Sequence, residues 1–171
     1  EIPLRLVGSE MCIRDSVRAA MEQDGAALCE FFSWLEAELA NAARTPDARM
    51  PLDEVAIDTH ITASRARRPN FISPSFSTIA GFNSNGAIMH YRAAQESCAT
   101  IEGDGLLLID SGGQYLGGTT DITRVIPVGT PSEAQKRDYT LVLKGLINLS
   151  STRFPRGTRA VSYTHLTLPT I

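Results

Sequence analysis

The chain has 171 residues, of which 43% are hydrophobic and 20% charged, an ordinary composition for a single globular domain. Its formal net charge of −3 does not fit a nucleic-acid-binding surface. No apolar run reaches the roughly 18 residues that a membrane-spanning helix needs. Three cysteines are too few for a disulfide scaffold, and free thiols indicate a reducing, cytoplasmic location. We therefore expect one soluble cytoplasmic domain without a nucleic-acid or membrane partner.

The two ends of the chain do not follow the pattern of a folded domain. Residues 6–16 (LVGSEMCIRDS) and 161–171 (VSYTHLTLPTI) both resemble translations of a transposase sequencing adapter. Matches at both ends, each in the expected orientation, indicate contamination, and such segments are set aside before a fold is predicted. We interpret residues 1–16 and 161–171 as non-native, adapter-like sequence and residues 17–160 as the natural part. His165 is then not a candidate metal ligand.

Two helices are predicted before residue 70. Val17 to about Ala43 carries apolar residues at spacings of three, four and seven, which is the pattern of an amphipathic helix. A second helix is predicted from Pro51 to Arg68, because acidic residues stand in its first turn and arginines in its last. We interpret Arg65, Arg67 and Arg68 as a solvated helix end rather than a nucleic-acid site, since the chain is acidic overall.

Short strands and turns are predicted from Phe71 onward, because brief apolar runs alternate with clusters of Gly, Asn, Asp and Ser. A third helix is expected to run to about Ser151, since Ser132 and Gln135 have the spacing of a capping box. Helices on both sides of a block of antiparallel hairpins predict an α+β fold. The predicted strands are Phe71–Ile72, Thr78–Phe82, Ala87–Tyr91, Leu106–Ile109 and Ile122–Val128.

Two aspartates are the main candidates for chemistry. Asp110 ends a buried apolar strand, where a carboxylate is costly unless a turn, an arginine or a metal ion compensates it. A hairpin folded between residues 115 and 116 would set Asp110 directly opposite Asp121, with Cβ atoms roughly 4.5–5.5 Å apart. Two carboxylates this close repel unless they share a proton or a cation, and such oxygen ligands suit Mg²⁺ or Mn²⁺. In the alternative, Asp110 caps the turn at residues 111–112 and Asp121 pairs with Arg124 or another basic side chain.

The histidines and cysteines are weaker candidates. His90 ends a predicted strand, where a lone histidine is more often a packed or surface residue than a functional one. His60 has no polar partner nearby in sequence and is interpreted as structural. Cys29 and Cys98 lack a Cys-x-x-Cys partner and are expected to be free thiols. The sequence contains no Gly-x-Ser-x-Gly, phosphate-loop or His-Glu-x-x-His motif.

Two strings of residues resemble a known family. GFNSNGAIMHYRA (residues 81–93) and LLLIDSGGQYLGGTTDITR (residues 106–124) closely resemble the metal-dependent Xaa-Pro aminopeptidases, the aminopeptidase P branch of the pita-bread peptidases. The likeness extends over nearly all of residues 17–160, which would then be a partial peptidase catalytic domain. The resemblance implies the N-terminal half of a pita-bread fold, with helices packed on antiparallel hairpins.

The resemblance also implies roles for three residues. Asp110 matches the first metal-ligand aspartate, and Asp121 matches the aspartate that bridges two divalent ions, usually manganese. His90 matches the histidine that hydrogen-bonds the substrate and helps to stabilise the tetrahedral intermediate. In the family, a metal-bridging hydroxide hydrolyses the bond before proline in second position and releases the N-terminal residue. The resemblance further implies that the full-length parent is a homodimer.

The chain departs from the family in one respect. The family completes its site with one histidine and two glutamates from the second half of the fold, and these are expected beyond Ala160. We therefore expect the full-length parent to be an active metalloaminopeptidase and this chain alone to be inactive. Prolidase, which requires a dipeptide, is the nearest alternative, and a catalytically dead pita-bread binding module is another. Retention of His90, Asp110 and Asp121 disfavours the binding module.

Overall fold

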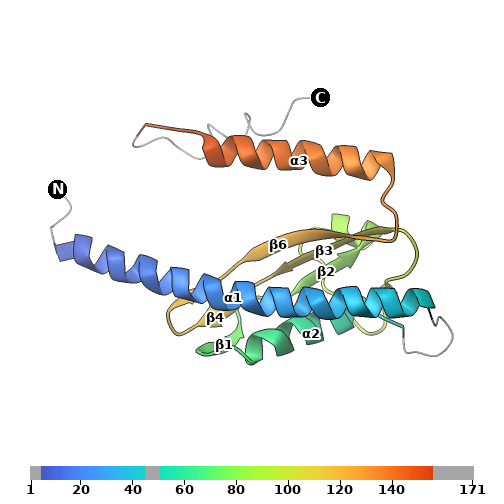
Figure 1. The fold of residues 1–171 in the computed structure, drawn as a ribbon, viewed down its shortest axis with the longest axis horizontal. Helices are drawn as coiled ribbons and strands as arrows, with labels where there is room; N and C mark the ends of the chain where they lie inside the picture. Colours follow the sequence, from blue (N-terminus) through green and yellow to red (C-terminus); the bar gives the residue numbers. More distant parts are fainter. Residues whose placement is uncertain (1–4, 45–50, 156–171) are drawn as a thin grey trace. The chain divides into compact units, whose positions relative to one another are not determined.

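The computed structural model describes residues 5–44 and 51–155, which fall into two units divided after Gly129 (Figure 1). The first unit contains the helices α1 (Arg5–Arg44) and α2 (Glu54–Ala66), a short 3₁₀ helix η1 (Asn83–Ala87) and all the strands. The second unit contains α3 (Glu133–Ser151). Among the described residues, no helix is long and apolar enough to cross a membrane.

Two small antiparallel sheets form the β part of the first unit. One sheet has the order β2-β3-β6, from β2 (Ile79–Phe82), β3 (Gly105–Ser111) and β6 (Ile122–Val128). The other has the order β1-β4-β5, from β1 (Phe71–Pro74), β4 (Gly113–Tyr115) and β5 (Gly118–Thr119). The expected α+β fold with antiparallel hairpins is therefore confirmed. The chain passes from β3 into β4 and returns through β5 to β6, so a single long hairpin spans both sheets.

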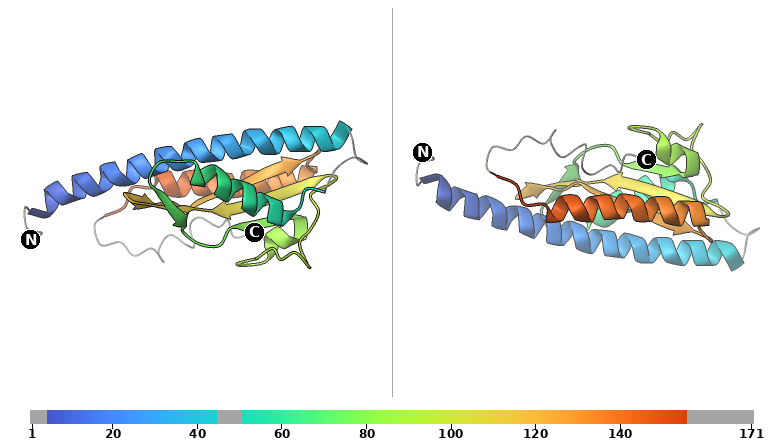
Figure 2. Two further views of the ribbon diagram at one scale, coloured as in Figure 1. Left: turned by 90° about the horizontal axis from the view of Figure 1, so that it is seen from below. Right: turned by 90° about the horizontal axis from the view of Figure 1, so that it is seen from above.

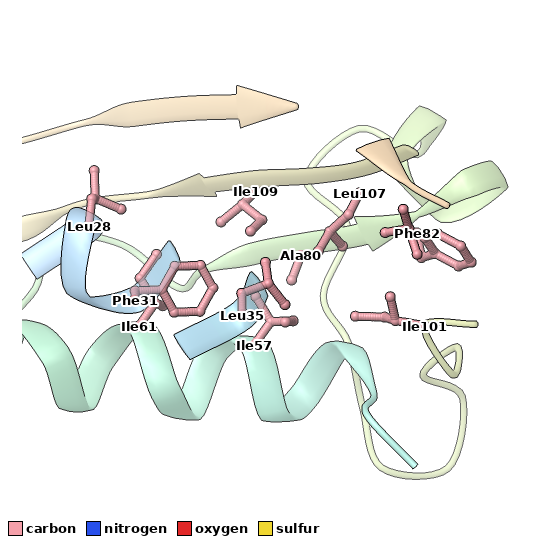
Figure 3. Close-up of a cluster of buried hydrophobic side chains, with 11 residues drawn as sticks. Leu28, Phe31, Leu35, Ile57, Ile61, Ala80, Phe82, Ile101, Leu107 and Ile109 are labelled. Atoms are coloured by element: carbon pink, nitrogen blue, oxygen red, sulfur yellow. The ribbon is translucent and has the colours of Figure 1, made fainter. Parts of the chain in front are cut away.

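The hydrophobic core lies between the helices and the β2-β3-β6 sheet (Figure 3). Helix α1 lies alongside α2 (Figure 2), and both contribute side chains to this core. Strand β3 alternates between the two sides of the sheet, as a half-buried strand does. Leu107 and Ile109 enter the core, whereas Leu106, Leu108 and Asp110 lie on the opposite face and are only partly buried. The alternation therefore places Asp110 on the sheet face that α1 and α2 do not cover.

Helix α1 confirms the predicted helix and extends it. It begins at Arg5 rather than at Val17, so residues 6–16 are helical here, whatever their origin. Its buried face contains Ala20, Asp24, Leu28, Phe31 and Leu35 at spacings of three and four, and so includes one charged residue. Residues 45–50, which follow the helix, lie outside the described residues.

Helix α2 (Glu54–Ala66) confirms the second predicted helix but is shorter than the predicted span from Pro51 to Arg68, and its arginines differ from expectation. Asp53 caps its N-terminus, and the carboxylate accepts a 2.7 Å hydrogen bond from the Ala56 amide. The prediction of a solvated arginine cluster is wrong for Arg65, which is 1% exposed and pairs with Asp24. Arg67 and Arg68 pair with Glu30 on α1.

The strand predicted at Ala87–Tyr91 is wrong. Residues 83–87 form η1, and a turn follows through His90. The chain folds back tightly here, since a Cβ on Gly81 would lie 2.6 Å from the Gly86 amide nitrogen. Only glycine permits this close approach, and the backbone leaves the sheet instead of continuing as a strand.

Helix α3 confirms the capping box. The Ser132 hydroxyl accepts from the Gln135 amide at 3.2 Å, and the Gln135 side chain accepts from the Ser132 amide at 2.8 Å. The helix ends at Ser151 as predicted.

Candidate metal centre

Asp110 and Asp121 lie on the same face of the β3–β6 hairpin, but not directly opposite each other. Asp110 pairs with Thr123, so the predicted register is wrong by two residues. The ladder of β4 and β5 shows the reason, because Tyr115 pairs with Gly118 and the turn is therefore Leu116-Gly117. Because the centre of the turn lies one residue further along the chain than predicted, the cross-strand partner of every residue moves by two positions. Asp121 is consequently a diagonal neighbour of Asp110, which still brings the two carboxyl groups together.

The electrostatics of the pair are those of two crowded carboxylates. Burial, the charge of Asp110 and a hydrogen bond between the two carboxyl groups raise the pKa of Asp121 above its usual value. Within residues 5–44 and 51–155 no ion pair joins either aspartate to a basic side chain. A proton or a cation relieves such repulsion, so the pair is suited to bind a positive ion.

The alternative roles considered for these aspartates do not fit the structure. Arg124 donates its hydrogen bond to the backbone carbonyl of Thr123 at 2.7 Å rather than to Asp121. Asp110 does not cap the turn at Ser111 and Gly112 but accepts a 3.0 Å hydrogen bond from the Thr123 hydroxyl. Neither of the two structural roles, a turn cap for Asp110 or an ion pair with Arg124 for Asp121, is therefore observed.

Thr123 is a member of the site that sequence reasoning missed. It lies directly opposite Asp110 in the ladder, and its hydroxyl holds the Oδ1 atom of that carboxylate. The contact fixes one oxygen of Asp110 and leaves Oδ2 free of that restraint. A correct placement of the turn at Leu116-Gly117 would have put Thr123 opposite Asp110 and so identified it.

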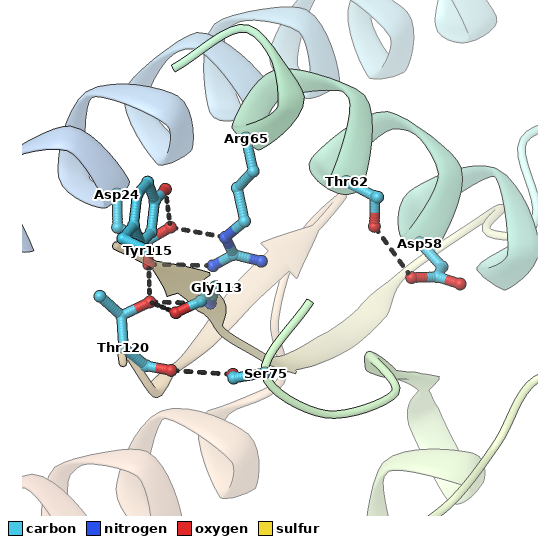
Figure 4. Close-up of polar contacts among 8 residues, drawn as sticks. All are labelled: Asp24, Asp58, Thr62, Arg65, Ser75, Gly113, Tyr115 and Thr120. Atoms are coloured by element: carbon cyan, nitrogen blue, oxygen red, sulfur yellow. Dashed lines mark hydrogen bonds and ion pairs between the residues drawn. The ribbon is translucent and has the colours of Figure 1, made fainter. Parts of the chain in front are cut away.

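The residue before Asp121 is held from several sides (Figure 4). Thr120 is 1% exposed, and its hydroxyl donates to Asp24 at 2.7 Å and accepts from the Gly113 amide at 2.8 Å. Its amide donates to the Gly113 carbonyl at 2.9 Å, and its carbonyl accepts from the Ser75 hydroxyl at 2.9 Å. These contacts fix the backbone from which Asp121 projects.

Asp24 is the centre of this buried network. It is 0% exposed and accepts hydrogen bonds from Arg65 at 2.6 and 3.2 Å and from the Tyr115 hydroxyl at 3.0 Å. Burial and the Asp24 carboxylate raise the pKa of Tyr115. The network joins α1, α2 and the hairpin, so charge-assisted hydrogen bonds hold the two helices to the segment that carries Asp121 into β6.

The other candidate side chains do not join the aspartates. His90 is exposed, lies in the turn after η1 and has a left-handed backbone with φ of 55°. In the part of the chain that the structure describes, no group of three or more His, Cys, Asp or Glu side chains is arranged to hold a metal. His60 stacks on Trp34 with ring centroids 3.7 Å apart, which fits its structural interpretation. Cys29 and Cys98 are free thiols, as predicted.

Comparisons with known proteins find a matching family and similar relatives. The sequence profile described as metallopeptidase family M24 matches residues 15–167. A relative from Pyricularia oryzae named "Probable Xaa-Pro aminopeptidase P" is 44% identical over 144 residues, which cover 84% of this chain and 22% of the relative. The chain thus spans about a fifth of the length of the curated relatives that it matches.

Solved structures show the same fold. An X-prolyl aminopeptidase from Caenorhabditis elegans, described as a cytosolic enzyme with a di-nuclear active site, is 32% identical with a TM-score of 0.80. The match covers 91% of this chain and 24% of that one. An Xaa-Pro dipeptidase from Bacillus anthracis matches with a TM-score of 0.71 at 23% identity, over 90% of this chain and 38% of that one. The fold is that of the N-terminal half of the pita-bread peptidases, as the sequence predicted.

Proposed function

The chain belongs to metallopeptidase family M24, and we propose that it forms part of a manganese-dependent Xaa-Pro aminopeptidase. Its substrates are peptides with proline in second position, from which the enzyme removes the N-terminal residue. The observation that carries this proposal is the carboxylate pair of Asp110 and Asp121, which lies on the sheet face that α1 and α2 do not cover, without a basic partner in the described ranges. The names of the curated relatives support the aminopeptidase assignment.

The donor set fits divalent metal ions of the hard or borderline kind. Both ligands are carboxylates, which suit Mg²⁺ or Mn²⁺ better than softer metals. Burial first, and then the charge of Asp110, raises the pKa of Asp121, and a bound cation would offset both effects. The di-nuclear site of the structurally similar Caenorhabditis elegans enzyme supports two ions. Asp110 and Asp121 would hold them together with ligands from outside this chain.

Each candidate site residue has a separate role in this proposal. Bound divalent metal supplies Lewis-acid polarisation and lowers the pKa of a water molecule. Asp110 and Asp121 place the negative charge that binds the metal, and Thr123 orients Asp110 through its hydroxyl. His90 hydrogen-bonds the peptide and stabilises negative charge that develops on the carbonyl oxygen of the scissile bond.

The remainder of the site is proposed to lie outside the chain. One histidine and two glutamates from the second half of the parent enzyme complete the ligand set, so the chain alone does not hydrolyse peptides. Residues 1–16 and 161–171 are, in the same proposal, adapter-derived, and residues 17–160 are natural. The parent is a cytoplasmic homodimer. A continuous genomic reading frame through Val161 would contradict the adapter origin.

Kinetics of the full-length gene product test the proposed function. With Mn²⁺ present it should cleave the first bond of peptides longer than two residues that have proline second. It should not cleave the same peptides with alanine second, and Asp110→Asn and Asp121→Asn should abolish turnover. Cleavage of Xaa-Pro dipeptides alone would identify a prolidase instead. Absence of all cleavage by the metal-loaded protein would favour the binding module.

A further inference from the structure

A buried carboxylate outside the metal pair has no basic partner in the described part of the chain. Glu54, the first residue of α2, is 0% exposed. Its Oε1 atom accepts hydrogen bonds from the Phe82 amide at 2.7 Å and the Asn85 side chain at 3.1 Å. Its Oε2 atom accepts from the Tyr91 hydroxyl at 2.7 Å, the Ala99 amide at 2.9 Å and the Asn85 side chain at 3.1 Å. Neutral donors alone therefore compensate this buried charge.

These donors lie on both sides of the turn that carries His90. Phe82 ends β2 and Asn85 lies in η1, both shortly before the turn. Tyr91 follows His90 directly, and its hydroxyl also accepts a 3.0 Å hydrogen bond from the Asn85 side chain. One carboxylate thus ties together the segment that enters the turn and the segment that leaves it.

The turn itself has little else to hold it. Ile88 is 53% exposed and Met89 84% exposed, so no apolar side chain anchors the turn in the core. Two backbone hydrogen bonds of 3.2 Å support it, from the Ile88 amide to the Asn85 carbonyl and from the Tyr91 amide to the Ile88 carbonyl. His90 nevertheless adopts a left-handed conformation, which is disfavoured for a residue with a side chain and persists only when its surroundings impose it.

We propose that Glu54 is a positioning residue that holds the His90 turn in its left-handed conformation. Through Asn85 and Tyr91 it fixes both ends of the turn, and the imidazole of His90 is thereby presented in one orientation. A buried carboxylate that costs stability unless all its hydrogen bonds are made is suited to this task, because it accepts only one arrangement of the donors around it. The consequence for catalysis rests on the proposed function of His90.

Nuclear magnetic resonance of the 171-residue chain tests the positioning directly and requires no enzymatic activity. Tyr91→Phe removes one hydroxyl from the network, Glu54→Gln disturbs all of it, and Tyr139→Phe on α3 is the matched control. We expect the backbone order parameter of His90 to be about 0.85 in the unchanged chain and the control, and to fall below about 0.6 in Glu54→Gln. Tyr91→Phe should move it in the same direction, with a shift of the His90 Cα resonance.

Unchanged His90 resonances and order parameters in both network variants would overturn the proposal, as would a His90 turn that is already mobile in the unchanged chain. The resonances of Leu107 and Ile109 in the core strand report whether the fold is intact. If Glu54→Gln unfolds the chain, Tyr91→Phe decides, because it deletes a single hydroxyl group.

A double-mutant cycle in the full-length gene product tests the catalytic consequence. Tyr91→Phe should lower kcat and change KM much less. It should have no further effect on kcat when His90→Ala is already present. An equal loss with and without His90 would overturn the positioning role. Failure of the parent protein to cleave any Xaa-Pro peptide would refute the proposed function but leave the resonance measurements on this chain to decide the role of Glu54.

Discussion

Asp24 on α1 accepts a 2.7 Å hydrogen bond from the hydroxyl of Thr120, the residue that precedes Asp121. The two residues are 96 positions apart, so a contact between distant parts of the chain fixes the backbone beside a candidate metal ligand. The β hairpin alone would leave that backbone held only by its ladder. The geometry of the carboxylate pair therefore depends on helix α1 as well as on the sheet.

Replacement of Thr120 tests the strength of this link. Thr120→Val keeps the shape of the side chain but leaves the buried Gly113 amide without its acceptor and removes one of the two donors to Oδ2 of Asp24. We expect a loss of about 1–3 kcal/mol in the free energy of unfolding, measured by urea denaturation. Thr120→Ser keeps the hydroxyl and should cost less. Equal stability of the two variants would show that the hydroxyl is not important.

A second prediction compares the stability lost when a buried ion pair is broken with that lost when a more exposed pair is broken. Asp24→Asn leaves the Arg65 guanidinium, which is 1% exposed, without its counter-charge. The expected cost is about 3–5 kcal/mol, because an unpaired buried charge is strongly destabilising. Glu30→Gln breaks the more exposed pairs with Arg67 and Arg68 and should destabilise much less. Thermal unfolding of both variants checks this order, and similar losses would contradict it.

Local patterns predicted the elements, whereas partners distant in sequence decided the site. The apolar spacing of α1, the order of charges along α2 and the capping box of α3 all act within a few residues, and each is confirmed. Asp24 falls on the apolar stripe of α1, which signals a buried charge, but its partner Arg65 lies on another helix. Periodicity shows that such a residue is buried and cannot show what it contacts.

Errors in the predicted turns changed which residues were expected to face each other and which were expected to form strands. A hairpin turn misplaced by one residue set Asp110 opposite Asp121 and hid Thr123. The residues after β2 were predicted as a strand because they are apolar, yet Ile88 and Met89 are exposed and the segment folds into a turn. Glu54 is one of the acidic residues at the start of the second predicted helix, and nothing near it in sequence indicates its acceptor role, because its partners lie 28 or more positions away.

The titration of Tyr91 gives a prediction about pH. Burial and the hydrogen bond to Glu54 raise the pKa of Tyr91 to about 12, above its usual value near 10. The folded chain therefore holds this proton more tightly than the unfolded chain does. The resulting stabilisation is complete below about pH 10 and is lost as the pH rises through about 12.

Urea denaturation across the alkaline range checks this sign. The unchanged chain should lose stability more steeply than Tyr91→Phe as the pH rises above about 10. The variant is the right reference because Tyr115, whose pKa is also raised, is present in both proteins. Identical slopes for the two proteins would contradict the raised pKa of Tyr91.

The central claim is that Asp110 and Asp121 together hold a divalent metal. Titration of the 171-residue chain with Mn²⁺, followed by paramagnetic broadening of its backbone resonances, tests this claim even where binding is weak. The resonances of Asp110, Asp121 and Thr123 should broaden first, and Asp121→Asn should abolish the effect. Asp58→Asn, which removes an exposed carboxylate on α2, should leave it unchanged. Broadening that spreads over the acidic surface, or that persists at Asp110 in Asp121→Asn, would contradict a metal site at this pair.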